Sequence, residues 1–196
     1  MVETVAAGIV WLGASVLVLA DGRRGLALGL ALVTAGFSLI ALTNGLPAGA
    51  AAVATGGGIA AWQCWRSPSA RWGIMPPGST PRLVLCIGSG LFGLWVAAAL
   101  MIGPGAGPRF AVLVVLGLMG ARVLSSSELH VVLAGIAGLA LALGAGAGLE
   151  VTSAGIVPDV AAGLIAAGVM ALPRPGHVHP GPAPSSGVGE SDNRAI

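Results

Sequence analysis

Long apolar stretches separated by short polar segments constrain this chain more than any other feature of its sequence. A hydrocarbon core about 30 Å thick takes roughly 20 residues of α-helix to cross. Charged residues make up only 8% of the chain, whereas a soluble domain has about 25%. We therefore predict an all-α protein, a polytopic bundle of about seven transmembrane helices, with five or six as the alternative. The predicted spans are Val2–Ala20, Gly25–Leu46, Ala48–Trp65, Leu83–Gly103, Phe110–Leu124, Leu129–Gly148 and Val151–Leu172.

The arginines predict the orientation of these spans. Most of them follow an odd-numbered span or flank the loop between spans three and four, at Arg23, Arg24, Arg66, Arg71, Arg82, Arg122 and Arg174. Because inner loops are enriched in basic residues, we expect the N-terminus outside and the C-terminus inside the cell's inner (plasma) membrane. Arg109 is the exception. Trp62, Trp65 and Trp72 cluster near one inner boundary, as interface anchors or, alternatively, as a ligand cage.

The basic residues exclude one class of function. All nine are arginines, so the chain has no lysine. A retinal protein needs a lysine amine for its Schiff base, and this chain is therefore not one. The net charge of +2 belongs to the predicted inner loops and gives no reason to expect a nucleic-acid partner. We predict a transmembrane domain over residues 1–173, followed over 174–196 by a disordered cytoplasmic tail rich in glycine, proline and serine.

Small residues are spaced for close helix packing. Gly25 with Gly29, and Gly144 with Gly148, form GxxxG pairs, and Gly56 opens a run of three glycines. Such residues let helices approach closely in lipid, where the hydrophobic drive between helices is small. We expect these faces to hold the bundle together and to dock other membrane subunits. The alternative is a compositional bias toward alanine and glycine.

One group of polar residues lies at the predicted inner end of spans five and six. Arg122, Glu128 and His130 supply a cation, a carboxylate and a side chain that titrates near neutral pH. They are candidates for a proton entry point. The alternative is structural, because Ser125 and Glu128 have the spacing of a capping box that would start span six.

Asp159 is the second candidate for proton chemistry. It follows Pro158 inside the last predicted span, and ionisable groups within a membrane are costly and usually functional. An Asp several residues inside the helix would be a buried proton carrier. If the helix begins instead at Val157, Asp159 lies in the first turn, where the helix dipole favours a carboxylate. Both interpretations remain open from the sequence.

The last two spans resemble the component E family of hydrogenase-4-type membrane complexes, which are related to the proton-pumping arm of respiratory complex I. Gly155-Ile156-Val157-Pro158-Asp159 is similar to the start of that family's final helix, and Gly117-Leu118-Met119 through Glu128 is similar to the portion before it. The loop Arg71-Trp72-Gly73-Ile74 is similar to a short basic connection. The resemblance implies a non-catalytic subunit beside antiporter-like subunits, with the redox chemistry in its partners.

We therefore predict a non-catalytic membrane subunit of a redox-linked, proton-translocating complex that binds no cofactor or metal of its own. Its proton-path residues would be Glu128, Asp159, His130 and Arg122. Catalytic motifs such as G-x-S-x-G and H-E-x-x-H are absent from the sequence. The alternative is a small stand-alone or homo-oligomeric transporter with Asp159 and the Pro158 break at its central site.

Overall fold

The described residues include six α-helices with defined bounds, and the separately described residues 84, 87–88, 91–92 and 95 are helical as well. The computed structural model describes residues 1–20, 22–66, 84, 87–88, 91–92, 95, 105–126, 128–150 and 156–172. The helices are α1 (Val2–Leu19), α2 (Arg23–Thr43), α3 (Pro47–Arg66), α5 (Ala106–Ser125), α6 (Leu129–Glu150) and α7 (Val157–Ala171). The prediction of an all-α protein is confirmed for these ranges.

Each helix coincides with one predicted span, and the largest difference is in the last. There α7 begins at Val157 rather than at Val151, with a proline in its first turn, where the missing N–H costs nothing. The predicted span Leu83–Gly103 falls mostly outside the described residues, as does the predicted tail over 174–196.

Among the described residues, four helices are long and apolar enough to cross a membrane, judged by length and composition: α1, α2, α5 and residues Leu129–Gly148 of α6. The helix α7 is also apolar but has only 15 residues. Large apolar side chains remain outside the bundle, among them Leu143, which is 60% exposed, and Leu164, which is 70% exposed. Helices that are apolar on their inner and outer faces suit a lipid solvent better than water.

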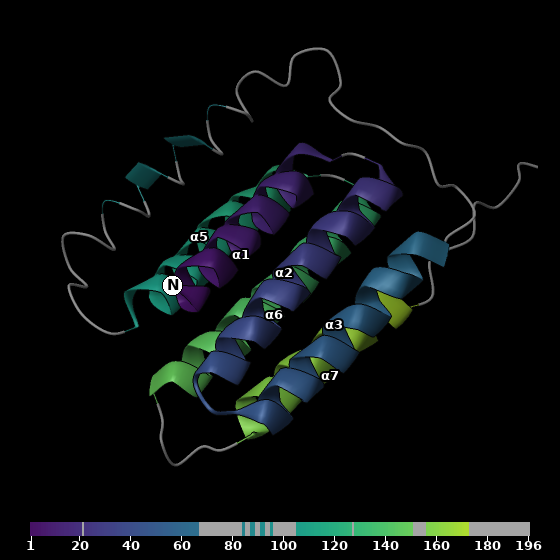
Figure 1. Cartoon of the computed structure of the whole chain (residues 1–196). Helices are drawn as coiled ribbons and strands as arrows, with labels where there is room; N and C mark the ends of the chain where they lie inside the picture. Colours follow the sequence, from purple (N-terminus) through teal and green to yellow (C-terminus); the bar gives the residue numbers. More distant parts are fainter. Residues whose placement is uncertain are drawn as a thin grey trace, which may run out of the picture.

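The helices form two stacked layers (Figure 1). One layer contains α1, α2 and α3, and the other contains α5, α6 and α7. Each helix of the first layer lies against its counterpart, so that α1 contacts α5, α2 contacts α6 and α3 contacts α7. The core between the layers is filled by apolar side chains such as Leu30, Leu118 and Leu141, each of which is almost completely buried.

Counterpart helices in the two layers run parallel. The start of α5 at Gly107 is close to the backbone of Glu3 at the start of α1, and Arg122 near the end of α5 reaches the carbonyl of Ala20 just after α1. The first turns of α3 and α7 also meet, at Gly49 and Asp159. Neighbours within one layer run antiparallel.

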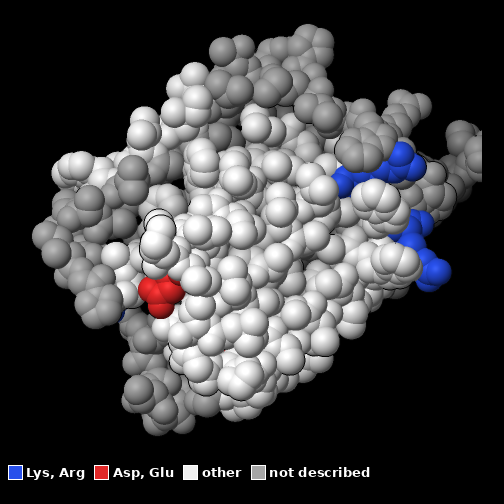
Figure 2. Space-filling model, viewed as in Figure 1, with Lys and Arg blue, Asp and Glu red and all other residues white. Residues whose placement is uncertain are grey.

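This arrangement gives the bundle two distinct ends. The arginine end contains the end of α1, the start of α2, the ends of α3 and α5, and the start of α6. Its described arginines are Arg23, Arg24, Arg66 and Arg122. Figure 2 shows basic side chains gathered at the edge where α2 begins and α3 ends. The Asp159 end contains the starts of α1, α3, α5 and α7 and the ends of α2 and α6, with Glu3 and Arg109 among its charged residues.

Glycines set the distances between the helices, as the sequence predicted. A β-carbon on Gly29 would lie 2.9 Å from the carbonyl oxygen of Gly13 in α1, and one on Gly56 would collide with the backbone of Gly163 in α7. Such backbone contacts cannot yield to a larger side chain as a flexible side chain can. Other glycines face open space, for example Gly58 and Gly117.

Candidate functional site

The Asp159 carboxyl group lies at the centre of the strongest candidate site. Asp159 is in the first turn of α7, yet it is only 3% exposed. The structure confirms the interpretation in which the helix begins at Val157, and the placement of Asp159 several residues inside the helix is wrong. The side chain is buried even at this helix start. The first turn is favourable for a carboxylate, since the N-terminal end of a helix carries a partial positive charge.

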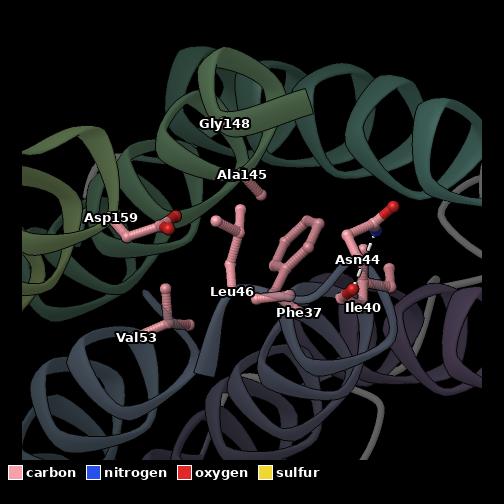
Figure 3. A pocket seen from close by; sticks show the side chains of 9 residues that line it. Phe37, Ile40, Asn44, Leu46, Val53, Ala145, Gly148 and Asp159 are labelled. Carbon is pink, nitrogen blue, oxygen red and sulfur yellow. Dashed lines mark hydrogen bonds between the residues drawn. The ribbon is translucent and has the colours of Figure 1, made fainter. Parts of the chain in front are cut away.

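A small cavity lies beside this carboxyl group (Figure 3). It is enclosed by the ends of α2 and α6 and the starts of α3 and α7, and the space open to the centre of a water molecule is about 20 Å³. Asp159 points into it from α7, and Asn44 lines it from the end of α2. The remaining lining is apolar or backbone: Phe37, Ile40, Ala41, Leu46, Val53, Ala145 and Gly148.

Two glycines make room for the carboxylate. A β-carbon on Gly49 of α3 would collide with the Asp159 carboxylate, and one on Gly148 of α6 would lie 3.7 Å from its Oδ1. The carboxylate therefore lies against backbone on two sides. Within the described part of the chain it accepts no hydrogen bond and forms no ion pair.

The size and lining of the cavity limit its chemistry. A volume of about 20 Å³ on this measure holds roughly one water molecule. Asn44 donates its side-chain N–H to the carbonyl of Ile40 at 2.8 Å, which fixes the orientation of its amide. The described residues contain no cluster of three or more His, Cys, Asp or Glu side chains suited to a metal ion.

At the arginine end, the structure brings Glu128 and His130 together. The Nε2 of His130 is 3.2 Å from the Oε2 of Glu128, and the two side chains are 23% and 64% exposed, respectively. A contact this exposed contributes little to stability. Both side chains lie at the surface of the bundle, at the start of α6.

The predicted capping box is wrong. Ser125 is the last residue of α5, and its hydroxyl donates back to the carbonyl of Arg122 at 3.3 Å. The helix α6 begins only at Leu129, where the backbone carbonyl of Glu128 accepts from the N–H groups of Val131 and Val132. The Ser125 hydroxyl therefore serves the end of α5 rather than the start of α6.

Arg122 does not join the pair of Glu128 and His130. It is 4% exposed, and one of its Nη atoms donates to the carbonyl of Ala20 at 3.1 Å. The guanidinium group satisfies a carbonyl at the end of α1, and the partial negative charge at that helix end favours a cation. The arginine therefore joins α5 to α1.

The predicted proton-path residues thus occupy both ends of the bundle. Glu128 precedes the first residue of α6, whereas Asp159 lies beside Gly148 near its last turn. At 1.5 Å per residue, these positions are about 30 Å apart along the helix axis. Between them the described helices are closely packed, with Gly56 against Gly163 and Gly144 against Ala162.

Sequence reasoning missed the neighbours of Asp159. Gly49 and Asn44 are more than 100 residues away from it in sequence, and no spacing signal connects them to it. Gly49 meets it because α3 and α7 are parallel and start at the same level, whereas Gly148 lies at the end of the preceding helix α6.

Comparison with known proteins gives no match: no family model fits the chain, and no curated protein or solved structure is significantly similar to it.

Proposed function

We propose that this chain is a seven-span protein of the inner membrane, with its N-terminus outside and its C-terminus inside. The end of α3 and the start of α5 lie at opposite ends of the bundle. One further crossing by residues 67–104, where Leu83–Gly103 is predicted as a span, accounts for this connection. The gathering of Arg23, Arg24, Arg66 and Arg122 at one end supports the orientation.

In that membrane the chain serves as a non-catalytic subunit of a redox-linked, proton-translocating complex of the hydrogenase-4 type. One observation carries this proposal: Asp159 and the pair of Glu128 and His130 lie at opposite ends of a closely packed bundle. We propose that neighbouring subunits supply the groups that connect these two ends for a proton crossing the membrane. Those subunits would also hold the redox cofactors.

A small stand-alone or homo-oligomeric transporter is the second candidate. The cavity at Asp159 favours it, because a buried carboxylate beside room for one water is a site for a proton or a very small cation. In this case the bundle would have to open between its layers, and the glycine contacts of α3 with α7 would separate.

Purification in mild detergent separates these proposals. The chain would be isolated through a C-terminal tag, and all copurifying proteins would be identified by mass spectrometry. Stoichiometric recovery of antiporter-like or iron–sulfur subunits supports the subunit proposal. Recovery of the chain alone, as a monomer or a homo-oligomer, overturns it in favour of the transporter.

The role of Asp159 is tested by Asp159→Asn, which keeps the size of the side chain but cannot carry an acidic proton. We expect the complex to assemble and its proton-coupled activity to fall at least tenfold, a loss of about 1.4 kcal/mol or more in transition-state stabilisation. Glu3→Gln is the matched control, because it removes one carboxylate at the same end of the bundle outside the cavity. If Asp159→Asn retains full coupling, Asp159 is only a helix-start residue.

A further inference from the structure

Two arginines and two tryptophans form a compact surface patch at the arginine end. The guanidinium carbon of Arg24 lies 5.8 Å from the ring centroid of Trp65, and that of Arg66 lies 5.1 Å from the ring centroid of Trp62. We call these four residues the Arg–Trp patch. It joins the start of α2 to the end of α3, and none of the contacts described for the Asp159 cavity includes it.

The four side chains share one surface for a simple geometric reason. Trp62, Trp65 and Arg66 are spaced i, i+3 and i+4 on α3, which places them on one helix face. The antiparallel packing of α2 on α3 brings Arg24 to the same level, where the Sγ of Cys64 also lies 3.3 Å from the carbonyl oxygen of Arg23. Trp62 is 58% exposed and Trp65 is 48% exposed, so the patch faces outward.

We propose that the Arg–Trp patch binds the phosphodiester headgroup of an anionic phospholipid. Stacking on an indole ring orients a guanidinium group. The five N–H donors of the guanidinium group can donate hydrogen bonds to a phosphate oxygen and to other acceptors at the same time. The first turn of α2 contains no acidic residue, and its backbone N–H groups also favour an anion.

The tryptophans determine the depth at which such a lipid binds. Indole rings prefer the headgroup level of a bilayer, with the ring in the apolar region and the N–H in the polar region. The two guanidinium groups lie over these rings and therefore at the depth of the lipid phosphates. The inference rests on the proposed membrane location, and in the proposed orientation the patch faces the inner leaflet, where anionic lipids attract basic residues.

The test uses the full-length chain, purified in detergent and stripped of lipid. Binding of phosphatidylglycerol and of zwitterionic phosphatidylcholine would be titrated by native mass spectrometry. Each arginine near an anionic headgroup is worth about a fivefold change in affinity, so Arg24→Gln with Arg66→Gln should weaken phosphatidylglycerol binding about 25-fold. Arg109→Gln, an exposed arginine at the opposite end, removes the same type of charge and should change the affinity by less than about twofold.

Several outcomes would overturn the inference. They are wild-type affinity in the double variant, an equal loss in Arg109→Gln, or equal binding of the two lipids by the wild type. If the double variant does not fold, the single variants Arg24→Gln and Arg66→Gln serve instead, each with an expected loss of about fivefold. Extraction of the wild-type chain from membranes by alkaline carbonate without detergent would contradict the membrane proposal itself, which separates that failure from a failure of lipid binding.

Discussion

The three consecutive glycines of α3 provide an internal test of the layer packing. Gly56 and Gly58 lie on the same helix, two residues apart, but their surroundings differ. A β-carbon on Gly56 would meet the backbone of Gly163 in α7, whereas one on Gly58 meets nothing within 4 Å. The same substitution by alanine therefore creates a collision at one position and not at the other.

The difference between these variants isolates the packing contact. Both replacements gain about the same helix propensity, roughly 1 kcal/mol for Gly to Ala, so this contribution cancels. What remains is the free-energy cost of overpacking at Gly56, which is typically about 1–3 kcal/mol. We expect a cost near the upper end of this range, because the Gly163 backbone cannot rotate away as a side chain can. We expect Gly56→Ala to be less stable than Gly58→Ala by this amount.

Thermal unfolding of the two variants in the same detergent would measure the difference. For a chain of this length, 1 kcal/mol corresponds to about 2–4 °C in Tm, so Gly56→Ala should unfold roughly 2–12 °C below Gly58→Ala. Equal Tm values would refute the close approach of α3 to α7. That result would also remove the reason for placing Gly49 against Asp159.

Three more predictions concern the ends of the bundle. Arg122→Met should lower the unfolding free energy by about 1–3 kcal/mol, because it leaves the Ala20 carbonyl without this donor. Arg109→Met, at an exposed position, should change the unfolding free energy by less than about 0.5 kcal/mol. Equal stabilities of the two variants in thermal unfolding would contradict the link between α5 and α1. Glu128→Gln should leave stability within about 0.5 kcal/mol, because the backbone rather than the side chain starts α6, but it should lower proton-coupled activity of the assembled complex; unchanged coupling would eliminate its proposed proton role. In a background with Cys64 and Cys86 replaced, Thr43→Cys should react with an impermeant maleimide added to intact cells, and Ser125→Cys only after permeabilisation; the reverse pattern would invert the proposed orientation.

The sequence predicted the helices well because their signals are local. An apolar run of about 20 residues reports its own secondary structure without reference to any partner, and the described helices accordingly coincide with six of the predicted spans. The small-residue pattern was also informative, since Gly29 and Gly144 both lie in close interhelical contacts. The capping box failed because Ser125 belongs to the end of α5, and the spacing rule does not say where the preceding helix ends.

The site at Asp159 was only half predictable, because its burial depends on contacts between segments far apart in sequence. The residue itself was conspicuous as an acid in an apolar run. Gly49 becomes its neighbour only when α3 and α7 lie parallel with their starts level, and no single-sequence pattern encodes that alignment. A second alignment, that of α1 with α5, brings Arg122 to the carbonyl of Ala20, since these two helices end side by side.

Two independent features of the molecule constrain the path of the chain between α3 and α5. The first is compositional, since the arginines predict that both connections after spans three and five lie on one side of the membrane. The second is geometric and uses no charge: α5 runs parallel to α1, and α3 does as well, so the end of α3 and the start of α5 lie at opposite ends of the bundle. In the proposed membrane, a chain that leaves one end of the bundle and returns at the other crosses the bilayer an odd number of times. One crossing by Leu83–Gly103 agrees with both the placement of the arginines and the directions of the helices. We therefore propose seven spans rather than six.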